Sequence, residues 1–212
     1  YAANFYYMGY NDQLILTGQI NDVGAYIREN VASSYRAGIE LEGAYAISKT
    51  WTLGGNLALS QNKIREFTEY IDDYSVDEFR QETNTYTNTD IAFSPNVVGS
   101  AIIEYKPAKN LSINWLSKYV GRQFLDNTSN NARSLDAFFT NDLRISYAAT
   151  PRFFKGLEVN LLINNLFNEL YEPNGYTFSY FVPGGFGREL VTENFYYPQA
   201  GTNFLLGVKM KF

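Results

Sequence analysis

Hydrophobic and polar residues alternate with a period of two at the C-terminal end of the chain. The apolar positions are Phe204, Leu206, Val208, Met210 and Phe212, and the polar residues between them include Asn203, Lys209 and Lys211. Successive side chains of a β-strand point to opposite faces, so this period predicts a strand with one apolar and one polar face. The predicted strand ends on an aromatic residue.

The same alternation recurs along most of the chain and predicts about eight antiparallel strands. We expect these strands near residues 3–16, 35–47, 51–62, 93–106, 111–122, 135–147, 157–168 and 204–212. Most of them are about 12 to 15 residues long, which exceeds the roughly 9 to 11 residues that a tilted strand needs to cross a bilayer. No segment needs a helix, so the sequence predicts an all-β fold.

The connections between these strands alternate between short and long. In chain order they are residues 17–33 (long), 49–50 (short), 66–90 (long), 107–109 (short), 124–134 (medium), 150–156 (a turn) and 169–200 (long). Antiparallel strands joined in this way place all short turns at one end of a sheet and all long loops at the other. Bacterial outer-membrane β-barrels have this asymmetry, so the pattern favours a transmembrane antiparallel β-barrel.

Alternation alone does not decide which face of the strands points outward, because a small soluble barrel is apolar inside. The sorting of the loops, the strand length and the terminal Phe favour an apolar face toward lipid. The polar face would then line the lumen. The charged residues that we expect there include Arg36, Glu40, Glu42, Arg122, Asp142 and Arg144.

Composition narrows the range of functions. The chain has no His and no Cys, which excludes a Ser-His-Asp triad, a His-ligated zinc and a thiolate site within these residues. A net charge of −5 argues against nucleic-acid binding. We therefore expect neither an enzyme nor a bound metal or cofactor.

Aromatic residues are abundant, with 18 Tyr and 16 Phe in 212 residues. Outer-membrane barrels carry girdles of aromatic side chains at both membrane interfaces, and this composition suits them. We assign six residues to such girdles: Trp51, Tyr105, Trp115, Tyr119, Tyr147 and Phe212. No run of about 18 apolar residues occurs, so no membrane-spanning helix is predicted.

Two segments resemble a known family. Residues 20–26 (INDVGAY) followed by residues 30–42 (NVASSYRAGIELE) are similar to the loop-and-strand pattern of TonB-dependent outer-membrane receptors, in particular those of Bacteroidetes type. Residues 164–168 (NNLFN), with residues 171–173 (YEP) after them, resemble the NLF(N)…Y element that precedes the last strand of these receptors.

The end of the chain carries the third resemblance. Residues 197–204, leading to Phe212, are similar to the terminal strand of the family, which has the pattern P-x-x-G-R-x-F. Thr202 and Asn203 stand where many members carry Arg. The resemblance covers essentially the whole chain, and its elements occur in order.

The resemblance implies a 22-stranded barrel of which residues 1–212 would be the last eight strands, an incomplete single domain. The chain opens in mid-pattern at Tyr1, and we read it as a piece of a longer polypeptide. The plug domain and the box that contacts the TonB complex would lie in an N-terminal region absent here. The implied location is the bacterial outer membrane, in contact with lipid and lipopolysaccharide.

The function that the resemblance implies is energy-coupled uptake of a scarce ligand, above all a ferric siderophore or a similar metal chelate. Import of an oligosaccharide or peptide beside a surface lipoprotein lid is the alternative within the family. Two alternatives belong to other functional classes of protein. One is a complete eight-stranded structural outer-membrane barrel, and the other is a soluble ligand-binding barrel. A membrane hydrolase ranks last because histidine is absent.

Two long loops contain the candidate binding residues. The last one is rich in aromatics, and we select Tyr176, Phe178, Tyr180, Phe186 and Tyr196 as ligand-binding residues. Aromatic faces supply large contact areas at low entropic cost, although the same residues could pack the loop or join a girdle. The acidic loop 66–90 could form a calcium site or a surface that selects cationic ligands, but it lacks the spacing of an EF-hand, so we expect a solvated loop.

The charged residues that we expect to face the lumen also have two possible roles. Arg36, Glu40, Arg122 and Arg144 could hold the plug or a passing anionic ligand. Alternatively, they could form a ladder of ion pairs between neighbouring strands.

Overall fold

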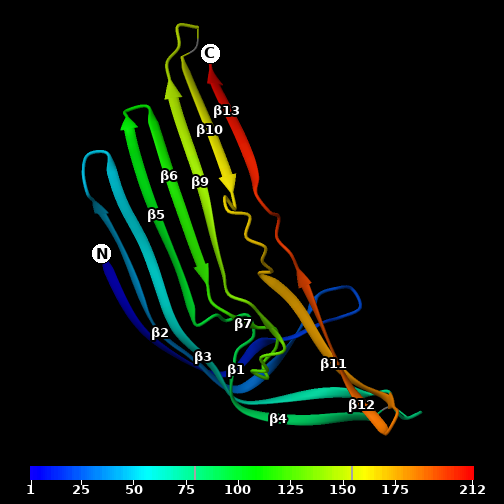
Figure 1. Ribbon diagram of the computed structural model, residues 1–212. Coiled ribbons are helices and arrows are strands. Elements are labelled where there is room, and N and C mark those ends of the chain that lie inside the picture. The colour runs from blue at the N-terminus through cyan, green and yellow to red at the C-terminus, as the bar shows by residue number, and fades with distance from the viewer. Residues whose placement is uncertain (79, 154) are drawn as a thin grey trace.

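Eight antiparallel strands form one twisted, open sheet in the computed structural model, which describes residues 1–78, 80–153 and 155–212 (Figure 1). In sheet order these strands are β1 (Ala2–Ile20), β2 (Tyr26–Ala46), β3 (Trp51–Asp73), β5 (Val97–Ala108), β6 (Leu111–Val120), β9 (Phe138–Ala149), β10 (Gly156–Asn164) and β13 (Asn203–Lys211). Each strand pairs antiparallel with the next, and β1 and β13 form the two edges. The all-β prediction is confirmed, and each of the eight strands on this path overlaps one of the predicted strands. In the described residues the sheet has 11 strands in all, because three strands of the connections also pair with it.

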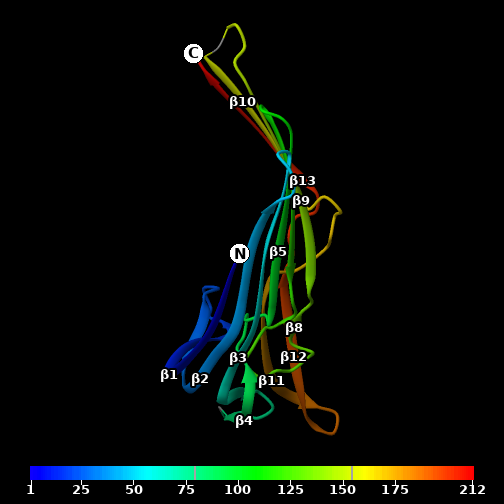
Figure 2. The same ribbon diagram turned by 90° about the vertical axis from the view of Figure 1, so that its left-hand side faces the viewer.

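The short and long connections lie at opposite ends of the sheet, as predicted. Figure 1 shows the β2–β3, β5–β6 and β9–β10 turns at one end, which we call the turn end. The long connections gather at the other end, the loop end, and Figure 2 shows the same separation from the side. Residues 79 and 154, which fall within two of the predicted connections, lie outside the described residues.

The long connection predicted at residues 17–33 is wrong, because β1 and β2 continue through most of it and leave only residues 21–25 as a turn. The other two long connections that we predicted as loops are β-hairpins. The distal half of β3 continues beyond the sheet and pairs with β4 (Arg80–Asp90), and β11 (Asn174–Gly184) pairs with β12 (Gly187–Tyr197). The medium connection between β6 and β9 contains the short strands β7 (Gln123–Phe124) and β8 (Ser134–Leu135). The three connections therefore contain ordered strands rather than only irregular backbone.

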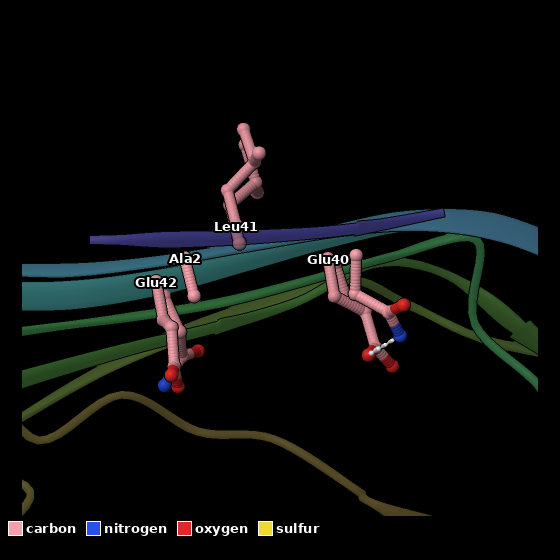
Figure 3. A pocket seen from close by; sticks show the side chains of 8 residues that line it. Ala2, Glu40, Leu41 and Glu42 are labelled. Carbon is pink, nitrogen blue, oxygen red and sulfur yellow. Dashed lines mark hydrogen bonds between the residues drawn. The ribbon is translucent and has the colours of Figure 1, made fainter. Parts of the chain in front are cut away.

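The two faces of the sheet differ in polarity. Figure 3 shows Leu41 on one face of β2 and Ala2, Glu40 and Glu42 on the other. The strand registers place further apolar residues on the face of Leu41, and they are exposed: Phe5, Ile39, Leu53, Leu57, Leu59, Ile103, Phe204, Leu206, Val208 and Met210. We call this the apolar face and the opposite one the polar face. A continuous exposed apolar surface of this extent marks contact with a membrane or a partner.

The buried core lies at the loop end rather than along the sheet. Ile15, Val31, Ile64, Phe67 and Ile91 form one cluster of buried side chains there. The connection between β6 and β9 packs nearby, and its Leu125 and Asn127 are completely inaccessible to solvent. This end of the molecule therefore has the most constrained side chains.

Among the described residues, no helix has the length and apolar character required to cross a membrane.

Candidate functional site

The connection between β6 and β9, residues 121–135, is held inside the loop end by hydrogen bonds to two other segments. Asn127 donates from Nδ2 to the carbonyl of Leu16 at 2.7 Å and accepts at Oδ1 from the amide of Ala92 at 2.8 Å. Ser129 donates to Asp90 Oδ2 at 3.0 Å and accepts from the Asp90 amide at 2.7 Å. These contacts satisfy polar groups that would be costly to bury unpaired. We call residues 121–135 the inner connection.

A buried arginine joins the inner connection to both hairpins. Arg133 is 5% exposed, and its guanidinium pairs with Glu69 of β3 and, at 2.8 Å, with Asp126. It also donates to Ser179 Oγ of β11 at 2.7 Å, while Tyr86 of β4 donates its hydroxyl to Glu69 at 2.8 Å. Burial, reinforced by the bond to Glu69, raises the pKa of Tyr86 to about 12. A buried charge requires such pairing, so we expect the three elements to be fixed relative to one another.

A second ionic group links the tips of the two hairpins. Asp73 at the end of β3 accepts from Arg80 Nε at 2.8 Å and from Arg188 Nη1 of β12 at 2.9 Å. Arg188 also pairs with Glu82 of β4 at 2.5 Å. Hydrogen bonds from Ser75 and from the two arginines hold the pKa of Asp73 well below its usual range. The carboxylate therefore stays ionised at neutral pH and bridges β3–β4 to β11–β12.

Backbone contacts complete the junction between the hairpins. Tyr180 and Phe181 of β11 pair in parallel with Asp72 and Asp73 of β3, and the amide of Tyr74 donates to the carbonyl of Phe181 at 2.9 Å. The guanidinium of Arg188 lies 4.2 Å from the centre of the Phe181 ring.

Aromatic rings line one face of the β11–β12 hairpin. Tyr176 and Phe195 lie directly opposite each other in the register, and their rings stack at 4.7 Å with an interplanar angle of 9°. Phe178 lies 5.8 Å from Phe195 and 6.0 Å from Tyr180, and Tyr197 lies 6.0 Å from Tyr176. These five residues are half-buried or exposed. We call them the aromatic face.

On the opposite face of the same hairpin, the middle of β11 carries small, polar, buried side chains. Thr177 and Ser179 are 2% and 8% exposed, and Ser179 receives the hydrogen bond from Arg133. The period of two in β11 therefore divides the hairpin into a face that packs on the inner connection and a face that remains available.

The five predicted ligand-binding residues are not all brought together. Tyr176, Phe178 and Tyr180 belong to the aromatic face. Phe186 is fully exposed at the tip of the hairpin, and Tyr196 pairs with Gly175 on the opposite face.

Sequence reasoning missed several residues of this end of the molecule. Phe195 and Tyr197 complete the aromatic face, and their alternation opposite Tyr176 would have been the signal for them. Arg133 and Glu69 are 64 residues apart, and no local pattern connects them.

Five of the six predicted lumen residues lie on the polar face of the sheet, and Arg122 lies outside its strands. Arg36 donates to Asn62 Oδ1 at 3.0 Å and to Ser94 Oγ at 3.2 Å. Glu40 accepts from Asn4 Nδ2 at 3.1 Å, the contact drawn in Figure 3. Glu42 follows on the same face, beside a hollow of about 390 Å³ that Glu40 also lines.

The other three lie farther along the chain. Asp142 Oδ1 accepts from the amide of Asn165 at 2.8 Å, and Arg144 lies opposite Asn114 in the register. Arg122 lies beyond the end of β6, and its guanidinium is 5.1 Å from the centre of the Phe124 ring.

The predicted ladder of ion pairs is wrong. Within the described part of the chain, Arg36, Arg122 and Arg144 form no ion pair, because their neighbours across the strands are amides, hydroxyls and apolar groups. Ion pairs that do join neighbouring strands include Glu158 with Lys209, at 3.4 Å, and Lys63 with Asp90, at 2.9 Å.

The acidic segment 66–90 also differs from expectation. We predicted a solvated loop, but Glu69 and Asp73 are 8% and 3% exposed and are engaged by arginines. In the described residues, no group of three or more acidic side chains is arranged to hold a metal ion.

Aromatic side chains mark both ends of the apolar face. Trp51 and Tyr105 stack at 4.3 Å near the turn end, and Tyr147 is exposed there. Tyr119 is exposed toward the loop end. Trp115 lies midway along β6 instead, where its indole donates to Asn141 Oδ1 at 3.1 Å.

Comparison with known proteins gives a family and a set of similar structures. Residues 1–166 match the family model described as TonB dependent receptor-like, beta-barrel. The ferric-catecholate import receptor Fiu from E. coli K12 is 17% identical, with a TM-score of 0.61 over 99% of this chain and 25% of that chain. The ferric yersiniabactin uptake receptor FyuA from Yersinia pestis is 14% identical, with a TM-score of 0.65 over 99% of this chain and 27% of that one.

A third similar structure is the siderophore receptor PiuA from Acinetobacter baumannii, which is 15% identical with a TM-score of 0.62 over 97% of this chain and 25% of that chain. This chain thus spans about a quarter of the length of these receptors. Comparison with curated proteins gives no match. Since the family model covers most of the chain, and the sheet has the alternation and loop asymmetry described above, the chain belongs to the β-barrel family of TonB-dependent receptors, which are outer-membrane proteins.

Proposed function

We propose that this chain is the C-terminal part of the barrel of a receptor that imports a metal chelate, such as a ferric siderophore, with energy supplied by the TonB complex. The observation that carries the proposal is the aromatic face of β11–β12, which is held in place at the loop end by Arg133 and Asp73. Similar structures include ferric-chelate receptors and a copper transporter, which supports the same class of cargo.

The geometry suits capture rather than bond chemistry. Stacked rings offer a large contact area with few rotatable bonds, so little entropy is lost when a ligand binds. Arg133 and Asp73 fix the hairpin before the ligand arrives, and such preorganisation increases affinity. The polar face of the sheet, with Arg36, Glu40, Glu42, Asp142 and Arg144, would then line the lumen and contact the plug.

The complete eight-stranded barrel is not favoured. A barrel in a membrane needs every strand paired on both sides, because unpaired backbone groups are costly in lipid. In the described residues, β1 pairs with β2 alone and β13 with β10 alone. Import of an oligosaccharide or peptide beside a surface lipoprotein remains the alternative, since sugars also stack on aromatic rings.

The test compares cargo classes in cells that carry the full-length receptor or its deletion. We expect deletion to abolish uptake of at least one radiolabelled ferric chelate, and collapse of the proton-motive force to have the same effect. A receptor with Tyr176→Ala and Phe195→Ala together should be present in normal amount but transport the chelate poorly. Normal iron uptake in the deletion strain, combined with loss of growth on an oligosaccharide, would show that the cargo is a glycan.

A further inference from the structure

Two carboxylates border the aromatic face without a positive partner. Glu193 lies opposite Phe178 in the hairpin register, and its Oε1 accepts from the hydroxyl of Tyr180 at 3.3 Å. Asp72 pairs with Tyr180 across the β3–β11 junction and accepts from Gln81 Nε2 at 2.9 Å. In the described part of the chain, neither carboxylate forms an ion pair.

Three arginines of the same region, Arg80, Arg133 and Arg188, are neutralised by carboxylates away from the aromatic face. Arg133 pairs with two carboxylates on the buried side of the hairpin, and Arg80 and Arg188 both pair with Asp73. Arg188 lies opposite Pro183 in the register, on the face that does not carry the stacked rings. None of these guanidinium groups is free to meet a ligand on the aromatic face.

The net charge of the two hairpins also favours a positively charged ligand. Acidic residues outnumber basic ones in the two segments 63–90 and 169–200. The acidic residues are Glu66, Glu69, Asp72, Asp73, Asp77, Glu78, Glu82, Asp90, Glu169, Glu172, Glu189 and Glu193; the basic residues are Lys63, Arg65, Arg80 and Arg188. The two hairpins therefore present a negative potential at the loop end.

The faces of aromatic rings and carboxylates both attract cations. The face of an aromatic ring carries the negative part of its quadrupole and attracts cations, and an adjacent carboxylate adds to that attraction. A multiply anionic ligand would instead meet like charges and would lack the arginines that usually recognise anions.

We propose that the aromatic face of β11–β12 binds a chelate that carries a positive charge, such as an ammonium group, and discriminates against anionic catecholate complexes. This inference rests on the proposed function, because it names the ligand class of the same site. It also distinguishes this chain from the ferric-catecholate receptor whose fold it shares.

The experiment measures binding of three probes to the full-length receptor by quenching of its intrinsic fluorescence. The probes are a linear ferric trihydroxamate with one free ammonium group, the same complex with that amine acetylated, and a ferric tris-catecholate. We expect the ammonium form to bind about threefold tighter than the acetylated form, as a single exposed cation–π contact would provide. The catecholate complex should bind weakest.

Variants then locate the charge effect. Glu193→Gln retains an acceptor for Tyr180 but removes the charge, and it should reduce the preference for the ammonium form, while the rings keep part of it. Glu66→Gln makes the same charge change on the exposed part of β3–β4 and should leave the preference unchanged.

Each outcome decides between the two proposals. Equal affinity for the ammonium and acetylated forms, or tightest binding of the catecholate complex, would overturn the charge inference and leave chelate import standing. If none of the three complexes binds, chelate import fails and the charge inference fails with it. The comparison of probes uses the unaltered receptor, so it does not depend on whether a variant folds.

Discussion

At the scale of single residues, charged side chains organise the loop end. Arg133 satisfies two carboxylates and a hydroxyl from three different elements, and Asp73 accepts from two arginines on two hairpins. Ion pairs at a protein surface contribute little, whereas removing one partner of a buried pair leaves an uncompensated charge. The effects of substitution should therefore differ sharply between buried and exposed arginines.

Replacing Arg133 with Met is expected to loosen the whole loop end. The substitution keeps the side-chain length but leaves Glu69 and Asp126 buried without a positive partner, which should cost about 3 kcal/mol in local stability. Limited proteolysis of the full-length receptor would report this as faster cleavage in β11–β12. Arg122→Met, which removes an arginine without an ion pair, serves as the control. Equal cleavage rates in the two variants would contradict the assigned role of Arg133.

The contact between the hairpin tips should depend on pH in the acid range. The pKa of Asp73 is lowered in the folded protein, so its contribution is complete above the ordinary Asp pKa of about 3.9 and is lost as the pH falls further. Hydrogen exchange of β12 amides should thus be constant between about pH 5 and 8, after correction for intrinsic rates, and should accelerate below about pH 4. Asp73→Asn should show fast exchange of the β12 amides at every pH in this range. If exchange in this variant still accelerated below about pH 4, another group would be responsible for the pH dependence.

At the scale of elements, the inner connection works as a spacer between β1 and the hairpins. Gly18 in β1 has φ = 92°, and a Cβ built on it would lie 2.4 Å from the carbonyl oxygen of Leu125. Gly24 in the β1–β2 turn has a similar φ of 81° but no atom within 4 Å of such a Cβ. The two glycines therefore share backbone conformation and differ in packing.

This pair separates backbone strain from steric exclusion. Gly24→Ala should cost about 1 kcal/mol, because an L-residue is strained at positive φ. Gly18→Ala should cost clearly more, because it must also displace the backbone at Leu125. Comparing the thermal unfolding of the two variants in the full-length receptor measures the difference. Equal losses would mean that the inner connection yields easily and does not act as a spacer.

The eight sheet strands could be predicted because each has one apolar and one polar face. Each strand segment therefore shows the period of two in its own residues. The β11–β12 hairpin has the same period: Thr177 and Ser179 alternate with Tyr176, Phe178 and Tyr180. We read those rings as a loop cluster, since the buried face is polar rather than apolar. Arg133 contacts this polar face through its hydrogen bond to Ser179. A contact between residues so far apart in the chain cannot be predicted from local periodicity.

At the scale of the whole molecule, we expect the exposed apolar face to be the surface that meets lipid. Leu57 and Ala58 are consecutive in β3 and point to opposite faces, with Ala58 opposite Glu40 in the register. The protein belongs to an outer-membrane family. We therefore expect a charged residue to be destabilising at Leu57 and tolerated at Ala58.

Leu57→Lys should destabilise the folded receptor in the membrane by about 2 to 4 kcal/mol, the cost of a lysine on the lipid face of a barrel near the bilayer midplane. Ala58→Lys places the same charge on the polar face beside Glu40 and should have little effect. Folding yield into lipid vesicles, followed by denaturant titration, measures both. If the lysine at 58 were the more damaging of the two, the assignment of the faces would be reversed.

The anchoring of Asn127 has a consequence for movement at the receptor's mouth. One amide side chain bonds at once to the backbone of β1 and to that of the segment between β4 and β5, and it is inaccessible to water. A flap that swung open alone would have to break these bonds in a dry environment, where nothing replaces them. Because Arg133 ties the same connection to both hairpins, we expect β3–β4, β11–β12 and the inner connection to keep their positions relative to β1 when a ligand enters.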